Sequence, residues 1–342
     1  MSQRNTISLR EWGLRPEFEQ ALAPGELIAR VVEEQKTRYL VAAEEGILRG
    51  QLAGKLLRPS VDRLERPVVG DWVAIRPLQG ESKAVILRVL PRASILRRKA
   101  AGETEAIQPL AANVDLTFIV TSLNREFNEK RLHRYLTVAQ EAGTRTAVLL
   151  TKIDLAPEST SNARALSEKY GVPCVPVCAL SGEGLANLGA LWSCGETAVF
   201  VGSSGVGKST LVNALLGRLE QETAAVRDDD DRGRHTTTSR RLLLLPNGAL
   251  VIDTPGLREI QLDAGHAEGL EKSFAAITEL ARGCRFANCA HETEPGCAVK
   301  AALARGELEE EQYASYLKLR RDLGSSERNS APRPPRIERK RK

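Results

Sequence analysis

The sequence of 342 residues contains no apolar run long enough to cross a membrane. Its first residues, MSQRNTISLREWG, lack the apolar core of a secretory signal. Neither sign of charge dominates, since the formal net charge is only +5. These absences argue against a membrane or secreted protein, and overall charge gives no argument for a nucleic-acid partner. We therefore expect a cytoplasmic protein, without a membrane partner, whose cysteines stay reduced.

The main charge imbalance lies at the C-terminus. Residues 333–342 carry six Lys or Arg against a single acid, Glu338. Such runs usually form solvated tails, and some of these tails bind RNA. We expect a disordered basic tail at residues 325–342.

Three regions with different hydrophobic patterns are expected after a leader at residues 1–24. Residues 25–104 contain five short segments in which aliphatic and polar residues often alternate, which predicts an all-β barrel of the oligonucleotide-binding (OB) type. Strand number alone also fits an SH3-like barrel. Residues 105–262 alternate strands with helices, as in an α/β domain with a mostly parallel sheet. Residues 263–324 favour helices and contain a cysteine and histidine cluster.

A phosphate-binding loop is predicted at GSSGVGKS, from Gly202 to Ser209. Its glycines let successive backbone N–H groups point at phosphates. Lys208 supplies a cation for the β- and γ-phosphates, and the Ser209 hydroxyl is a ligand for Mg²⁺. The predicted nucleotide contacts in this segment are Gly202, Ser203, Ser204, Gly205, Val206, Gly207, Lys208, Ser209 and Thr210.

The magnesium and γ-phosphate motif is predicted at DTPG, where Asp253 ends a buried strand. A carboxylate there can hold Mg²⁺, usually through water, and the N–H of Gly256 can meet the γ-phosphate. The GRHTTTS segment lies between the two phosphate motifs. One of its threonines should complete the magnesium shell, and Thr236 or Thr237 is preferred over Thr238.

The sequence TKID, from Thr151 to Asp154, is the predicted guanine motif. The two carboxylate oxygens of Asp154 can accept both hydrogen bonds from the Watson–Crick edge of guanine, which adenine cannot match. The stem of Lys152 can cover one face of the base. Thr151 replaces the usual Asn, which leaves guanine preference intact and weakens affinity. A second loop, which includes Ala179 and Ser181, would contact the guanine through a backbone N–H.

The position that often holds a water-orienting Gln, directly after DTPG, is Leu257. His235 is therefore the predicted residue for positioning the attacking water, and with Lys208 it forms the predicted catalytic pair. The alternative is an exposed histidine in a flexible loop.

Four metal-binding side chains gather near the C-terminus, at Cys284, Cys289, His291 and Cys297. Three thiolates and an imidazole suit a closed tetrahedral zinc site of structural type, with one Zn²⁺ per chain. Free thiols are the alternative. The other three cysteines, Cys174, Cys178 and Cys194, are expected to be buried thiols.

The guanine motif precedes both phosphate motifs, which is the order of the circularly permuted GTPases. This order, the N-terminal barrel and the segment CRFANCAHETEPGCAV together resemble the ribosome small-subunit-dependent GTPase A family. The resemblance implies an OB-fold domain, a permuted GTPase domain and a C-terminal zinc domain. It also implies GTP hydrolysis with Mg²⁺ that is stimulated by the small ribosomal subunit, and binding to that subunit and its rRNA late in its maturation. Thr151 and the acidic run from Asp228 to Asp231 depart from the family pattern.

Three other functions compete with this one. A metabolic P-loop ATPase or kinase would lack the guanine motif. An RNA-binding module that is merely stabilised by nucleotide is compatible with Leu257. A permuted GTPase acting on the large subunit fits the zinc cluster and barrel less well. We expect a monomer in which the segment after Gly256 couples nucleotide state to the zinc region.

Overall fold

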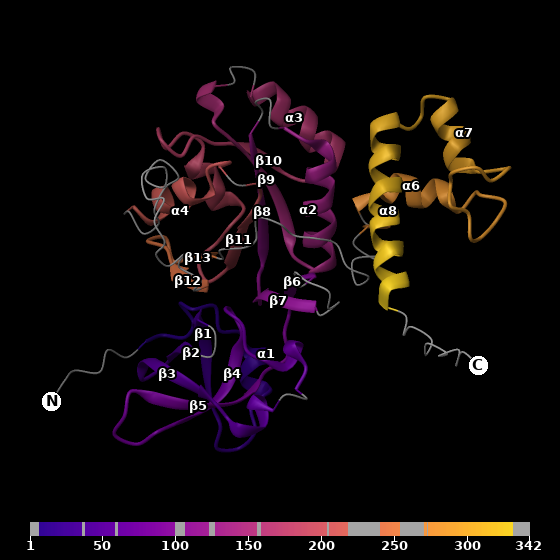
Figure 1. Cartoon of the computed structure of the whole chain (residues 1–342). Coiled ribbons are helices and arrows are strands. Elements are labelled where there is room, and N and C mark those ends of the chain that lie inside the picture. Colours follow the sequence, from indigo (N-terminus) through magenta and orange to yellow (C-terminus); the bar gives the residue numbers. More distant parts are fainter. Residues whose placement is uncertain are drawn as a thin grey trace, which may run out of the picture.

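The computed structural model describes most of the chain. The described residues are 7–35, 38–58, 61–99, 107–122, 127–155, 159–203, 205–217, 240–253, 270–271 and 273–330. They form an N-terminal barrel, a central α/β region and a C-terminal helical region, the last lying beside the α/β region (Figure 1).

Five strands close the N-terminal barrel. They are β1 (Leu27–Gln35), β2 (Arg38–Ala43), β3 (Gly46–Leu52), β4 (Trp72–Pro77) and β5 (Lys83–Val89). Their order is β1-β2-β3-β5-β4, and β4 pairs back onto β1. The β3–β5 pair is parallel, and the other pairs are antiparallel. The barrel prediction is confirmed, and this Greek-key order favours the OB type over the SH3-like type.

The residues before the barrel pack against it. The short helix α1 (Pro16–Gln20) buries Phe18, whose ring centroid lies 5.7 Å from that of Trp72.

Three further elements lie within or after the barrel sequence. Two short 3-10 helices, η1 (Gly54–Leu57) and η2 (Arg63–Glu65), follow β3. After the barrel, β6 (Ile95–Lys99) and β7 (Ile107–Ala112) form an antiparallel ribbon that the sequence pattern does not predict.

A buried arginine joins the barrel to the α/β region. Arg30 of β1 donates to the Thr197 hydroxyl at 2.8 Å, and its guanidinium lies 5.3 Å from the Trp72 ring centroid. Burial lowers the pKa of Arg30 to about 10, so it stays protonated at neutral pH. Beside it, β1 pairs with β12 (Arg240–Leu244), so barrel and α/β region share one eleven-stranded sheet.

The α/β region is doubly wound. Its other strands are β8 (Leu116–Ser122), β9 (Arg145–Thr151), β10 (Cys174–Pro176), β11 (Thr197–Val201) and β13 (Leu250–Asp253). They lie in the order β10-β9-β8-β11-β13 and all run parallel, as predicted. Strand β12 is antiparallel to β13 across the predicted turn at Asn247 and Gly248.

Helices cover both faces of this sheet. The helices are α2 (Glu129–Glu141), α3 (Ser159–Tyr170) and α4 (Lys208–Leu216), with 3-10 turns η3 (Ile153–Leu155) and η4 (Leu185–Ala190). One core contains apolar residues of α2 and α3, and a second contains those of α4 and η4. Strand β8 contributes Ile119 to the first core and Phe118 to the second, since successive side chains of a strand alternate between faces.

The C-terminal region consists of α6 (Ala275–Ala281), α7 (Ala298–Ala304) and α8 (Glu310–Ser330). Sequence periodicity predicts one helix over 270–283, but a turn at Phe274 separates its first residues from α6. Helix α8 continues to Ser330, past residue 324 where the sequence predicts its end. Residues 331–342 lie outside the described part.

Two expectations about thiols and membranes can be compared with the fold. Cys178 is buried, but Cys174 is half-buried and Cys194 is exposed, so the expectation of three buried thiols is wrong. Cys194 lies in the Ser-Cys-Gly turn before β11, at the surface. None of the helices in the described ranges combines the length and apolar character needed to cross a bilayer.

Candidate nucleotide site and metal centre

The nucleotide motifs meet at the carboxyl edge of the parallel strands. The phosphate loop follows β11, Asp253 ends β13, the TKID motif follows β9, and Ala179 and Ser181 follow β10. Because β9, β8, β11 and β13 are successive neighbours in the sheet, motifs far apart in the sequence share this edge. Ligands of doubly wound sheets bind there. Lys208, Ser209 and Thr210 form the first turn of α4, whose N-terminus favours phosphate.

Glycine is required at two turns of the phosphate loop. Gly202 has a φ of +151°, and a Cβ there would overlap the carbonyl oxygen of Val120 on β8. Gly207 has a φ of +102° and precedes α4 directly. Residues other than glycine rarely adopt these φ angles, so the loop cannot keep this path if either glycine is replaced.

Two cations lie on the phosphate loop. The Nζ of Lys208 donates to the carbonyl oxygens of Gly202 at 2.8 Å and Ser203 at 2.5 Å. From α2, the guanidinium of Arg131 donates to the Ser203 hydroxyl. Sequence reasoning missed Arg131, because the motif gives no sign of which helix faces the loop.

The first residue of the guanine motif is bonded to the phosphate loop. Thr151 is 4% exposed, and its hydroxyl lies 2.7 Å from the carbonyl oxygen of Val206 and 3.2 Å from that of Thr121. A hydroxyl has one proton to donate, and the shorter contact is to the phosphate loop. The threonine thus connects the end of β9 to the loop between β11 and α4.

The rest of the guanine motif turns away from the strand. Lys152 has a φ of +60°, a left-handed conformation that costs a residue with a side chain about 1–3 kcal/mol. This turn leaves Asp154 exposed, with one carboxylate oxygen 3.5 Å from the Cys178 thiol. Cys178 directly precedes Ala179, so the two guanine loops are in contact. Its thiol was expected only to be buried, and the structure adds this contact.

Several predicted site residues lie outside the described part of the chain. They are Ser204, His235, Thr236, Thr237 and Gly256. Of the predicted magnesium ligands, Ser209 lies in the first turn of α4, which follows β11, and Asp253 ends β13, the neighbour of β11 in the sheet.

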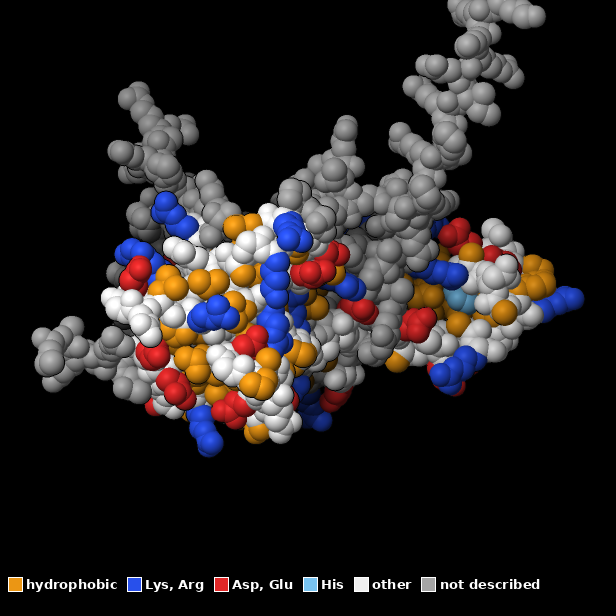
Figure 2. Space-filling model, turned by 90° about the horizontal axis from the view of Figure 1, so that it is seen from below, with side chains coloured by type: hydrophobic (Ala, Val, Ile, Leu, Met, Phe, Trp, Pro, Cys, Tyr) orange, Lys and Arg blue, Asp and Glu red, His pale blue; other side chains and the backbone are white. Residues whose placement is uncertain are grey.

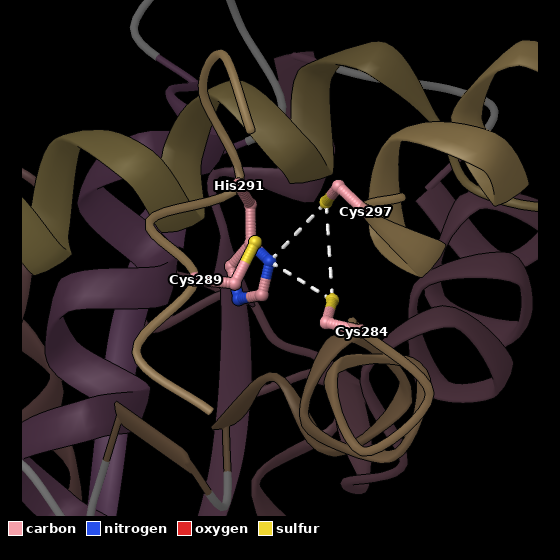
Figure 3. A group of neighbouring side chains, drawn as sticks. All are labelled: Cys284, Cys289, His291 and Cys297. Atoms are coloured by element: carbon pink, nitrogen blue, oxygen red, sulfur yellow. Dashed lines mark hydrogen bonds between the residues drawn. The ribbon is translucent and has the colours of Figure 1, made fainter. Parts of the chain in front are cut away.

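The predicted zinc ligands lie together (Figure 3). The ligand atoms of Cys284, Cys289, His291 and Cys297 all lie within 4.8 Å of one another. The Sγ atoms of Cys284 and Cys297 are 3.9 Å apart, and His291 Nδ1 lies 3.5 and 3.4 Å from them. Sulfur ligands at about 2.3 Å from a central zinc would be about 3.8 Å apart in a tetrahedron. The spacing of Cys284, His291 and Cys297 therefore fits a tetrahedral zinc site, and Cys289 completes the donor set within 4.8 Å.

The fold holds the backbone of these ligands. His291 has a φ of +64°, and its carbonyl oxygen accepts the Tyr313 hydroxyl of α8 at 2.5 Å. Arg320, also on α8, donates to the Cys289 carbonyl oxygen at 3.0 Å. Burial lowers the pKa of His291, and the nearby Arg320 charge lowers it further. The neutral imidazole, which is the form that binds metals, is thereby favoured.

Comparisons with known proteins agree with this arrangement. The model of the RsgA GTPase family matches residues 89–263. A curated Small ribosomal subunit biogenesis GTPase RsgA from Methanosarcina acetivorans is 42% identical over 298 residues, which is 87% of this chain and 79% of that protein.

Two solved structures share the fold. YjeQ from Thermotoga maritima has a TM-score of 0.63 and 27% identity, covering 87% of this chain and 98% of that one. YloQ, titled a circularly permuted GTPase, has a TM-score of 0.62 and covers 88% of this chain and 96% of that one; at 22% identity it supports the fold alone. The permuted motif order, the site geometry and these matches agree, and the chain belongs to the RsgA GTPase family.

Proposed function

We propose that this protein hydrolyses GTP while acting on the small ribosomal subunit during its maturation, with rRNA as part of its target. The observation that carries the GTPase assignment is the bond from Thr151 to Val206, which joins the guanine motif to the phosphate loop in a permuted sheet. The subunit assignment is supported by relatives named for small ribosomal subunit biogenesis. The protein is proposed to work in the cytoplasm as a monomer.

The predicted residue roles are retained as part of this proposal. The phosphate loop and Lys208 bind the β- and γ-phosphates, and Asp154 reads the guanine edge. Ser209, Asp253 and Thr237 hold Mg²⁺, which neutralises phosphate charge when bound. In the structure Lys208 donates to loop carbonyl oxygens. Bound phosphates would offer its ammonium more strongly charged acceptors.

The hydrolytic step is proposed to depend on His235, because Leu257 has no group that can orient water. A neutral imidazole can accept a hydrogen bond from the attacking water and orient it toward the γ-phosphate. We expect His235→Ala to lower turnover roughly a hundredfold, as removal of such a group typically does, with nearly unchanged GTP affinity. Equal turnover in single-turnover assays would rule out this role.

The four C-terminal ligands are proposed to hold one structural Zn²⁺. The donor set is closed, so no position is left for a substrate. Metal analysis of the purified protein should give one zinc per chain, and Cys289→Ser should reduce it. Absence of zinc from protein purified without chelators would contradict the assignment.

The domain boundaries are proposed as predicted, with a leader at residues 1–24, a barrel at 25–104, a GTPase domain at 105–262, a zinc domain at 263–324 and a basic tail at 325–342. Limited proteolysis would test them. Cleavage is expected between the barrel, the GTPase domain and the zinc domain, and in the tail beyond the end of α8, whereas α1 packs against the barrel and should be protected. Resistant fragments that cross those boundaries between domains would contradict them.

Subunit specificity needs a direct experiment. The protein should co-sediment with small subunits in the presence of a non-hydrolysable GTP analogue, and small subunits should stimulate its turnover. Large subunits serve as the matched control, and ATP serves as the control for base choice. Stimulation by large subunits alone, or by neither subunit, would contradict the proposal.

A further inference from the structure

An exposed aromatic ring lies inside the cysteine cluster. Phe286 is 41% exposed, and the other large hydrophobic side chains exposed in the described ranges are all Leu or Ile. It lies between Cys284 and Cys289, so the proposed metal would hold the loop on both sides of it. A large apolar ring kept in water on a constrained loop is a candidate contact surface.

The neighbouring arginine is held over this ring. The guanidinium carbon of Arg285 lies 5.5 Å from the Phe286 ring centroid, within the range of a cation–π interaction. Its backbone N–H donates to the carbonyl oxygen of Gly296 at 3.1 Å. A Cβ at Gly296 would lie 3.0 Å from the Cβ of Arg285. A residue larger than glycine at this position would therefore crowd the Arg285 side chain. The fold therefore fixes the backbone and the Cβ of Arg285 next to the ring, and the guanidinium lies over the ring in this structure.

The carboxylates of the same loop are already engaged. Glu292 forms a 3.0 Å ion pair with Arg321 of α8. Glu294 accepts hydrogen bonds from the backbone N–H groups of Ala290, Glu292 and Thr293, and these bonds lower its pKa to about 2. Arg285 has no such carboxylate partner among the ion pairs of the described residues. At the zinc-bearing end of the molecule, basic side chains project beside hydrophobic surface (Figure 2).

We propose that Phe286 and Arg285 form a stacking platform for an unpaired base of RNA. A base has a π-face that can stack on an aromatic ring, and a guanidinium can stack as well or contact the adjacent phosphate. Paired bases in a helix offer no free face, so the platform selects single-stranded or looped RNA. The choice of RNA as the nucleic acid rests on the proposed function, whereas the stacking geometry comes from the structure.

The platform can be tested with the full-length, zinc-loaded protein and a short fluorescent RNA without secondary structure. Base stacking contributes about 1–3 kcal/mol, so Phe286→Ala should weaken binding roughly five- to hundredfold. Phe286→Trp should bind like the wild type, and binding of the same RNA annealed into a duplex should be insensitive to Phe286→Ala.

Salt titrations distinguish the contribution of the Phe286 ring from that of the Arg285 charge. Phe286→Ala should leave the slope of log K against log salt unchanged, whereas Arg285→Ala should reduce it by roughly 0.7 if it contacts one phosphate.

A matched control uses a second arginine of the same region. Arg282 is exposed but paired with Glu279 at 2.6 Å, so Arg282→Ala should change neither affinity nor slope. Zinc content and basal GTP turnover should be unaffected in every variant, which excludes unfolding as the cause.

The outcomes distinguish this platform from the proposed function. Unchanged RNA affinity in Phe286→Ala would overturn the platform even if the protein sediments with small subunits. Loss of subunit binding without loss of RNA binding would also overturn it, in favour of a protein contact. Weakened RNA binding in a protein that ignores ribosomal subunits would support the platform and contradict the proposed function.

Discussion

At the residue scale, Thr151 has a clearer role in the structure than in the sequence. The motif alone presents it as an Asn replacement that loses an amide. The fold places its hydroxyl 2.7 Å from the Val206 carbonyl oxygen, so it still joins the two halves of the nucleotide site.

We expect Thr151→Val to weaken guanine nucleotide affinity roughly tenfold, since a buried acceptor left without a donor costs about 1–3 kcal/mol. Thr151→Ser should retain most of the affinity. Titration with a fluorescent GDP analogue measures the effect. Thr146→Val, on the same strand but away from the site, is the control, and equal affinity in Thr151→Val would show that the bond is unimportant.

A second residue, His133 of α2, makes stability depend on pH. It is 1% exposed, and neither ring nitrogen has a hydrogen-bond partner. Burial is the main cause that lowers its pKa to about 4. The Glu129 charge raises the pKa by a smaller amount, and the Lys169 charge lowers it slightly. Because the unfolded state then binds the proton more tightly, this histidine removes stability as pH falls from about 6.5 to about 4.

We expect His133→Phe to reduce the loss of stability between pH 7 and pH 5. Urea unfolding of both proteins at the two pH values provides the comparison, because carboxylates that also titrate are common to both. An identical pH dependence in wild type and variant would contradict the assignment.

At the element scale, the strand–loop–helix unit of β11 and α4 depends on a close approach of two backbones. Gly202 lies against the Val120 carbonyl oxygen of β8, and the loop keeps its path only if no side chain intervenes. The sequence motif requires glycine here for phosphate binding, and the structure adds packing between strands as a second reason.

Gly202→Ala should abolish measurable nucleotide binding, because the added Cβ displaces either β8 or the loop. Gly189→Ala is the matched control, since nothing lies within 4 Å of a Cβ at that position. Binding is measured by calorimetry with GDP. Normal affinity in Gly202→Ala would mean that the loop adopts another path when nucleotide is bound.

At the scale of the whole molecule, aromatic rings connect the GTPase region to the C-terminal region. The ring of Phe274 stacks on His133 of α2 at 4.5 Å and meets Tyr316 of α8 edge to face at 5.5 Å. Lys169 of α3 pairs with Glu309 just before α8 at 2.7 Å. These contacts form an interface, here called the seam, between the C-terminal region and helices α2 and α3, which cover one face of the GTPase sheet.

We expect the seam to respond to nucleotide, because the chain leads from the γ-phosphate motif into the C-terminal region. Distance labels on α3 and α8 should report different separations with a GTP analogue and with GDP, and Phe274→Ala should broaden both distributions. Arg164→Ala, which removes an exposed ion pair on α3, should leave them unchanged. The same orientation in both nucleotide states would refute the coupling.

Local signals in the sequence account for much of the fold. Alternating or continuous apolar runs predicted all five barrel strands and the parallel strands of the GTPase sheet, because strand burial is recorded in side-chain pattern. The ribbon of β6 and β7 was not predicted, since Arg97, Arg98 and Lys99 hide its alternation. The turn at Phe274 was also missed, because the periodicity of an amphipathic helix continues across it.

Residue types at short spacings were enough to predict the phosphate loop, the guanine motif, the cysteine and histidine cluster and the permuted order of the motifs. Tertiary structure decided which distant residues meet. The bonds from Thr151 to Val206 and from Arg131 to Ser203, the seam at His133 and the ring of Phe286 under Arg285 depend on strand neighbours, helix faces and loop paths. Those are set by packing of the whole chain, and no local pattern encodes them.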